Sequence, residues 1–283
     1  MEITDYPFVF QTDSNLVKES LKKNSNYLIE YSEYNAIGQD KYCAVYFSSN
    51  NIYYPNSPDV FRREVLHKNR YEWYGERIRK ASKHIFIRDN KKQWYLEGIN
   101  SEINTIERLC DFLKAETEGY KTVMLGSSAG GYAAVLFGSL LKSEYILSFN
   151  GQFKLNDLLE SSNESIDPII FRERNNILIN QYFSLNTFIS NPSRVYYFYS
   201  NNSRWDVLNM RHVEKTGINM VSFNTSIHGI PFIKSALPTV INSSRMKLDS
   251  WNNGKYNPLL FSIKYGGVFP TFYVLCRKLL RKS

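Results

Sequence analysis

The strongest chemical signal in the chain is a serine near its middle, Ser128. It lies in Gly126-Ser-Ser128-Ala-Gly130, a Gly-x-Ser-x-Gly pattern, between an apolar segment at 122–125 and a segment of small residues at 131–141. A nucleophilic serine on a sharp strand-to-helix turn needs this context, because bulkier neighbours would collide there. The phosphate-binding pattern Gly-x-x-x-x-Gly-Lys-Ser/Thr is absent. We interpret Ser128 as a nucleophile; a structural serine in a tight turn is the alternative.

A serine nucleophile needs a general base, and the chain offers four histidines. In the strand-turn-helix setting of Gly-x-Ser-x-Gly, the base comes last in the order serine, acid, histidine, which leaves His212 and His228. His228 follows the last predicted strand and precedes Gly229 and Pro231, in a loop at a strand end. His212 falls in a predicted helix at 207–214, as a surface histidine would. We expect His228 to be the base.

The acid that orients this base should follow the strand before the last one. Asp206 is the only carboxylate in the loop after the predicted strand 195–200. It also suits the N-cap of the predicted helix 207–214, because a carboxylate there accepts from free backbone N–H groups. Asp157, after the predicted strand 145–149, is the second candidate for the acid.

Further residues are expected to stabilise the oxyanion or to line the substrate site. The backbone N–H of Ala129 would face the oxyanion, and a second N–H would come from Ser48 or Ser49, which the sequence does not separate. Aromatic rings stack on sugars. The candidates for substrate contact are a carboxylate at a strand end and nearby aromatic side chains: Asp89, Trp94, Tyr95, Tyr132 and Trp205.

Short β-rich runs alternate with amphipathic segments along most of the chain. The predicted strands are 7–11, 27–32, 42–47, 84–88, 122–125, 145–149, 195–200 and 219–223, with helices at 103–117, 131–141, 169–183 and 207–214. Several strands are continuous apolar runs, which is typical of a buried parallel sheet. The pattern predicts an α/β fold with a mostly parallel sheet of about eight strands, flanked by helices. We place this domain at 1–245, with 151–190 as a lid-like insertion or an ordinary crossover.

The last part of the chain, 246–283, differs in composition. No Asp or Glu occurs after Asp249, while aromatic and aliphatic residues alternate with the bases Lys264, Arg277, Lys278, Arg281 and Lys282. Such a basic amphipathic tail suits the surface of an anionic membrane. A helix packed on the domain with its bases in water is the alternative.

Composition narrows the class of protein. Of the 283 residues, 43% are hydrophobic, 22% are charged and 15% are aromatic, which is typical of a globular domain rather than a disordered chain. Three distant cysteines predict neither a disulfide framework nor a metal site. No secretory signal and no membrane-spanning segment stand out, so we expect a cytoplasmic protein, with peripheral contact at the inner membrane through its tail. The net charge of +8 favours an acidic partner, although no nucleic-acid recognition motif occurs.

The elbow Gly126–Gly131, Asp206 and His228 resemble the α/β-hydrolase superfamily in order and in context. The Gly-Ser-Ser-x-Gly-Gly elbow, Ser48 at a strand end, and Arg88-Asp89 followed by Trp94-Tyr95 are similar to hydrolase-fold proteins of bacterial capsule gene clusters. That resemblance implies an O-acetyltransferase that moves acetyl from acetyl-CoA, a substrate rather than a bound cofactor, to a surface polysaccharide. An esterase acting on carbohydrate O-acetyl groups is the alternative. A non-catalytic protein that binds glycan or an assembly complex is the second alternative.

Overall fold

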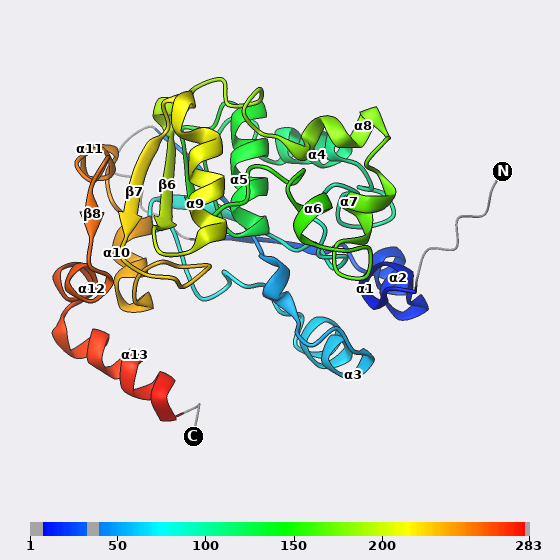
Figure 1. Cartoon of the computed structure of the whole chain (residues 1–283), viewed down its shortest axis with the longest axis horizontal. Helices are drawn as coiled ribbons and strands as arrows, with labels where there is room; N and C mark the ends of the chain where they lie inside the picture. The colour runs from blue at the N-terminus through cyan, green and yellow to red at the C-terminus, as the bar shows by residue number, and fades with distance from the viewer. Residues whose placement is uncertain (1–7, 33–39, 281–283) are drawn as a thin grey trace.

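The computed structural model describes residues 8–32 and 40–280 and contains one eight-stranded sheet (Figure 1). The strand order is β1-β3-β2-β4-β5-β6-β7-β8. Only β1 pairs antiparallel to its neighbour, and all other neighbouring strands are parallel. The strands are β1 (Tyr27–Tyr31), β2 (Tyr42–Phe47), β3 (Ala81–Ile87), β4 (Lys121–Ser127), β5 (Tyr145–Phe149), β6 (Val195–Ser200), β7 (Asn219–Phe223) and β8 (Lys255–Tyr256). The expected mostly parallel α/β sheet is therefore confirmed.

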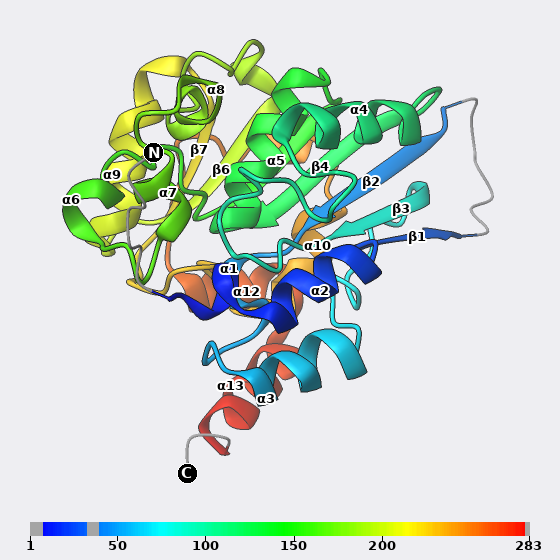
Figure 2. The ribbon, with the colours of Figure 1, turned by 90° about the vertical axis from the view of Figure 1, so that its right-hand side faces the viewer.

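Helices cover both faces of this sheet (Figures 1 and 2). One face packs against α4 (Ile106–Glu116), α5 (Ala129–Leu140) and α9 (Arg204–Val213), and the other against α10 (Leu237–Ile241), α11 (Arg245–Asp249) and α12 (Pro258–Gly266). The remaining elements are α1 (Phe10–Asp13), α2 (Asn15–Lys23), η1 (Asn50–Ile52), α3 (Pro58–Phe61), η2 (Arg62–His67), α6 (Leu158–Ser161), α7 (Pro168–Arg172), α8 (Ile177–Asn180), η3 (Gln181–Phe183), η4 (Pro192–Arg194), η5 (Glu214–Thr216), η6 (Lys234–Ala236) and α13 (Val268–Leu280).

The helix that follows the elbow, α5, is the central helix of the fold. Its residues from Ala129 to Ser139 are all buried, because it lies against β4 and β5. By contrast, α4 is amphipathic: Ile106, Leu109 and Leu113 are buried on one side, and the Thr105 hydroxyl caps its first turn. Small residues at the start of α5 let it approach the sheet closely, so the turn before it is held tightly.

Two predicted elements differ from the structure. The prediction of a strand at 7–11 is wrong for the residues that the structure describes, since helix α1 begins at Phe10. Pro7 lies outside the described residues. Asp13 accounts for the helical turn, because its carboxylate accepts from the Val9 N–H at 2.7 Å and pairs with Arg172 at the same distance. The eighth strand is instead β8. The helix predicted at 169–183 is broken into α7, α8 and η3.

The compositional boundary at 246 does not coincide with the end of the core. Leu248, Trp251 and Phe261 are buried among the side chains of β5, β6 and β7, and β8 pairs with β7. Of the elements after residue 246, only α13 stands away from the body of the molecule in both views (Figures 1 and 2). Among the described residues, no helix has the length and apolar character that crossing a bilayer requires.

A buried histidine in β3 couples the fold to pH. His84 is 2% exposed, and its Nδ1 accepts from the Tyr46 hydroxyl at 3.0 Å while Nε2 contacts Ser32 Oγ at 3.2 Å. The Tyr46 oxygen accepts from the Ile78 N–H, which leaves its own proton for His84. This arrangement suits a neutral imidazole. Burial, with a smaller effect from the positive charge of Arg77, lowers the pKa of His84 from 6.5 to about 4.

We expect His84 to make the folded state less stable in acid. Between pH 6.5 and about 4 the unfolded chain binds a proton that the folded chain excludes, so the free energy of unfolding falls as pH falls through this window. The full loss is on the order of 3 kcal/mol. Urea unfolding at several pH values should show that His84→Gln flattens this dependence, whereas His67→Gln, at an exposed position, retains it. An unchanged slope in His84→Gln would contradict the assignment.

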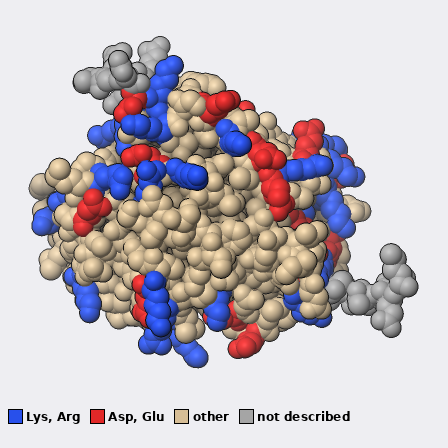
Figure 3. Space-filling model, turned by 90° about the horizontal axis from the view of Figure 1, so that it is seen from above, with Lys and Arg blue, Asp and Glu red and all other residues tan. Residues whose placement is uncertain are grey.

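Charge is mixed on the face seen from above. There, basic and acidic side chains lie next to one another around an uncharged centre (Figure 3). The net charge of +8 is therefore not displayed on that face as a single basic patch. A broad electrostatic footprint of the kind that nucleic-acid binding requires does not form there.

Candidate active site

Ser128 lies on the turn that joins β4 to α5. Its backbone angles are φ 53° and ψ −121°, in a region that residues other than glycine rarely adopt. The two motif glycines make this turn possible. A Cβ on Gly126 would lie 2.2 Å from the Gly130 carbonyl oxygen, and one on Gly130 would lie 2.2 Å from the Phe47 carbonyl oxygen. The chain therefore presents Ser128, which is half-buried, at the carboxyl end of the central strand.

Ser128, His228 and Asp206 form a continuous hydrogen-bonded chain, as the sequence predicts. His228 Nε2 lies 2.8 Å from Ser128 Oγ, and His228 Nδ1 lies 2.8 Å from Asp206 Oδ1. The Asp206 side chain is fully buried, while that of His228 is 38% exposed. The three residues follow β4, β6 and β7, so they meet at the carboxyl ends of parallel strands.

Asp206 lies in the first turn of α9, which begins three residues earlier than the helix predicted at 207–214. Ser203, rather than Asp206, caps this helix, and its hydroxyl accepts from the Asp206 backbone N–H at 3.3 Å. The N-terminal end of a helix favours a negative charge. Asp206 Oδ2 is buried and accepts no hydrogen bond from any described residue. The negative charge therefore faces His228 through Oδ1.

Two residues that the sequence analysis missed hold the loop of His228. Asn150, which follows β5 at φ 44°, donates through Nδ2 to the carbonyls of Ile227 and Gly229, both at 3.1 Å. Ser200, at the end of β6, donates to the Ile227 carbonyl at 2.6 Å and also accepts from Asn150. These bonds lie on both sides of His228, so Asn150 and Ser200 fix the direction in which its ring points.

The expected oxyanion donors differ in their hydrogen bonding. Ala129 is the first residue of α5, where a backbone N–H has no acceptor within the helix. The Ser48 N–H donates to the Ile87 carbonyl at 2.9 Å, and the Ser49 N–H donates to the Glu72 carboxylate at 2.6 Å. Both serine N–H groups thus have acceptors in this structure. Access to the Ser49 N–H requires the Glu72 side chain to move.

Gln152, another residue that the sequence analysis missed, lies beside the serine. Its Oε1 is 3.4 Å from Ser128 Oγ and accepts from Trp94 Nε1 at 2.7 Å. Because a tryptophan ring nitrogen only donates, this bond determines which end of the Gln152 amide faces Trp94. The Gln152 amide, which belongs to no recognisable sequence motif, is thereby held next to Ser128.

Asp89 organises the turn that carries Trp94 instead of lining an open site. Its carboxylate is buried and accepts from the backbone N–H groups of Lys91, Gln93 and Tyr95, at 2.7 to 3.0 Å. Burial raises the pKa of Asp89, and these hydrogen bonds oppose that shift. Trp94 and Tyr95 have φ of 53° and 63°, which is unusual for bulky residues. Asp89 therefore stabilises a strained turn and positions Trp94 against Gln152.

The other predicted residues lie in different surroundings. Tyr132 is fully buried, and its hydroxyl donates to the Tyr182 carbonyl, so it offers no open platform for a sugar. Trp94 is 2% exposed, and its ring N–H donates to Gln152 Oε1, so its ring is not open to a sugar either. Trp205 is half-buried next to Asp206. His212 contacts Ser184 Oγ at 3.0 Å and Asp157 pairs with Lys154, so neither alternative joins the Ser128 chain.

Removing the ring N–H of Trp94 should loosen Gln152 and slow the reaction. We expect Trp94→Phe to lower kcat for an acetyl ester about tenfold with a smaller change in KM, because orientation rather than binding is lost. Trp251→Phe is the matched control: its Nε1 donates to Tyr265 at 3.0 Å in the core on the other side of the sheet. Equal kinetic effects of the two substitutions would argue against a role for the Trp94–Gln152 bond.

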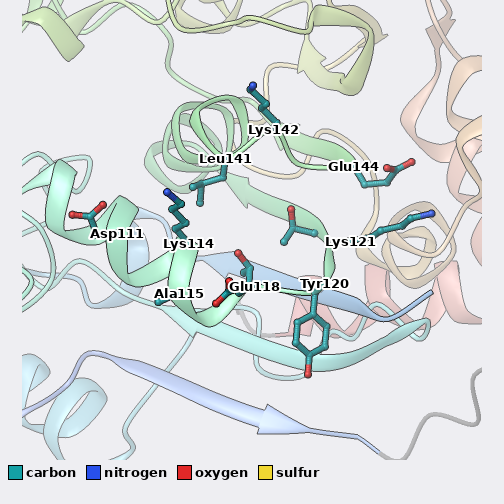
Figure 4. Close-up of a pocket in the computed structure, with 11 residues that line it drawn as sticks. Asp111, Lys114, Ala115, Glu118, Tyr120, Lys121, Leu141, Lys142 and Glu144 are labelled. Atoms are coloured by element: carbon teal, nitrogen blue, oxygen red, sulfur yellow. The ribbon is translucent and has the colours of Figure 1, made fainter. Parts of the chain in front are cut away.

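A hollow of about 560 Å³ lies elsewhere, at the amino end of β4 (Figure 4). Its lining comes from α4, the start of β4 and the turn between α5 and β5, and it mixes Lys114, Lys121 and Lys142 with Glu118 and Glu144. Because Ser128 follows the opposite end of β4, this hollow does not belong to the Ser128 site. In the described part of the chain, no three His, Cys, Asp or Glu side chains gather as metal ligands would.

A mostly parallel sheet with a serine on a tight turn after a central strand, followed by Asp and His after later strands, defines the α/β-hydrolase fold. No family model and no curated protein sequence matches the chain. Among solved structures, the capsule O-acetyltransferase of Neisseria meningitidis serogroup A has this fold in common with it, with a TM-score of 0.51. The two are 14% identical over 78% of this chain and 92% of that chain.

Two further solved structures are more distant. Esterase B of Lactobacillus rhamnosis matches with a TM-score of 0.40 and 8% identity, over 70% of this chain and 75% of that chain. A peroxisomal α/β-hydrolase of Saccharomyces cerevisiae matches with a TM-score of 0.38 and 12% identity, over 69% and 73% of the two chains.

Proposed function

We propose that the protein is a serine acyl-transfer enzyme that O-acetylates a bacterial surface polysaccharide, with acetyl-CoA as the donor. The observation that carries the acyl-transfer part is the chain in which His228 contacts Ser128 and Asp206 at 2.8 Å each. The fold that the chain has in common with a capsule O-acetyltransferase supports the choice of an acetyl group and of a surface polysaccharide as its acceptor. The net charge of +8 suits acidic glycans and the phosphates of CoA.

The geometry suggests how each step would proceed. His228 Nε2 takes the proton of Ser128 Oγ as the oxygen attacks the acyl carbonyl, and Asp206 stabilises the imidazolium that forms. The Ala129 N–H, at the positive end of α5, faces the developing oxyanion. Collapse expels the thiol of CoA, which takes its proton from His228, and leaves an acetyl ester on Ser128. His228 then removes a proton from the sugar hydroxyl, which attacks this ester, and returns that proton to Ser128 Oγ as the ester bond to the serine breaks.

Ester hydrolysis is the second candidate, and one observation favours it. The His228 side chain is 38% exposed, so water has access to the base that would activate the second nucleophile. If water attacks the acyl-enzyme, acetate leaves and the protein acts as an O-acetyl esterase. Which outcome prevails depends on how well a bound sugar excludes water from His228.

Product analysis distinguishes the two reactions. The full-length protein is incubated with isotope-labelled acetyl-CoA and capsular polysaccharide, and separately with O-acetylated polysaccharide. Label on sugar that is absent with Ser128→Ala supports the transferase, whereas Ser128-dependent release of acetate supports the esterase. If neither reaction occurs and a fluorophosphonate probe leaves Ser128 unlabelled, the protein is a binding protein of hydrolase fold.

A further inference from the structure

The last helix carries an exposed apolar face. At about 100° per residue, one arc of about 140° on α13 contains seven apolar side chains, which we call the α13 face: Val268, Phe269, Phe272, Tyr273, Cys276, Leu279 and Leu280. All seven are exposed, Phe269 to 88% and Tyr273 to 65%. Val274 and Leu275, outside this arc, are half-buried. The helix is therefore apolar toward the body and also toward solvent, which is unlike an ordinary surface helix.

The α13 face is anchored to the chain that carries His228. Thr271 Oγ1 lies 2.8 Å from Ser235 Oγ in η6, which follows the His228 loop, and Ser262 in α12 accepts from the Ile233 N–H at 2.9 Å. Phe232 packs on Phe261 in the same region. In both views α13 projects on the same side as α3 (Figures 1 and 2). The face is thus held in a fixed place close to the end of the loop of His228.

The segment of the chain that carries this face has charges of one sign. No Asp or Glu occurs after Asp249, while six Lys and Arg residues do: Lys255, Lys264, Arg277, Lys278, Arg281 and Lys282. Lys264 and Arg277 are exposed, and Arg281 and Lys282 lie beyond the described residues. Exposed aromatic and aliphatic side chains beside bases match the two parts of an anionic bilayer surface, its acyl boundary and its phosphate headgroups.

We propose that the α13 face docks the protein onto a membrane surface rich in anionic phospholipids. At 13 residues, α13 is long enough to lie in the interface but not to span a bilayer. A second copy of the chain fits the face less well, because pairing two such tails would bring bases against bases with no acid between them. This inference goes beyond the proposed function and does not depend on it.

Vesicle flotation of the full-length protein tests the docking. We expect it to float with vesicles of phosphatidylglycerol and phosphatidylethanolamine at least about tenfold more than with phosphatidylcholine alone. Phe269→Ser/Tyr273→Ser should lower the partition coefficient at least about tenfold, since two apolar contacts are lost. Lys264→Glu/Arg277→Glu should remove the preference for the anionic vesicles.

The matched control is Ile177→Ser/Leu178→Ser on α8, whose side chains are 71% and 70% exposed and which lies far from α13 (Figure 1). This variant should float like the unmodified protein. Equal loss in the control, or no flotation of the unmodified protein, would overturn the proposal. So would light scattering that shows a dimer dissociated by Phe269→Ser/Tyr273→Ser without any flotation. Cleavage of a soluble ester should be unchanged in the α13 variants, so a failure here is distinguishable from a failure of the proposed function.

Discussion

Replacing Ser128 with alanine is expected to lower kcat/KM for a chromogenic acetyl ester by at least about 10⁴-fold. The substitution removes the oxygen that His228 contacts at 2.8 Å, and the neighbouring Gln152 side chain is an amide, which cannot replace a serine as nucleophile. Stability should change little, because alanine keeps the Cβ and the same strained φ of 53°. Initial-rate kinetics and a thermal melt of the purified variant measure both quantities.

The neighbouring serine of the same motif supplies the control. Ser127 is the last residue of β4, is 4% exposed, and takes no part in the chain from Ser128 to Asp206. Ser127→Ala should therefore retain activity within about threefold. Loss of activity in Ser127→Ala but not in Ser128→Ala would place the nucleophile elsewhere.

Asp206→Asn should have the second-largest effect, a fall of kcat of about 10³- to 10⁴-fold at neutral pH. The amide has nearly the volume of the carboxylate, so the packing of α9 should be retained. It cannot stabilise the imidazolium by charge, and if its nitrogen faces Nδ1 it selects the wrong tautomer of His228. Rates measured from pH 6 to 9 on a soluble ester would report the loss.

Asp157→Asn is the companion measurement, because Asp157 is the other carboxylate that the sequence offers for this role. It pairs with Lys154 at 2.5 Å, and both side chains are partly exposed. Such a pair contributes little to stability. A wild-type rate in Asp157→Asn, together with a large loss in Asp206→Asn, would assign the acid. The reverse result would exclude Asp206.

The sequence identifies the parts of the site that rest on local rules. The glycines around Ser128 are required by the turn itself, and the order of Ser128, Asp206 and His228 along the chain follows from the alternation of strands and helices. The parallel sheet was predictable for the same reason, since its strands are continuous apolar runs. Errors arose where a distant contact overrides the local pattern. The segment predicted as a strand at 7–11 contains the start of helix α1, whose Asp13 pairs with the distant Arg172.

Gln152, Asn150 and Glu72 could not be predicted because no local pattern marks them. Each acts through a partner that is distant in sequence: Trp94 for Gln152, the carbonyls around His228 for Asn150, and the Ser49 N–H for Glu72. From its composition, the tail at 246–283 was likewise predicted to be separate from the domain. In the structure, Trp251 and Phe261 complete the core, and only α13 departs from it.

The two bonds from Asn150 to the backbone around His228 have a consequence for the entropy of the reaction. They connect β5 directly to the loop after β7, past the intervening strand β6. Because the loop is ordered by the sheet itself, the conformational freedom of the base is lost during folding and not when a substrate arrives. Binding energy from the substrate then remains available to orient the acyl group and the attacking hydroxyl.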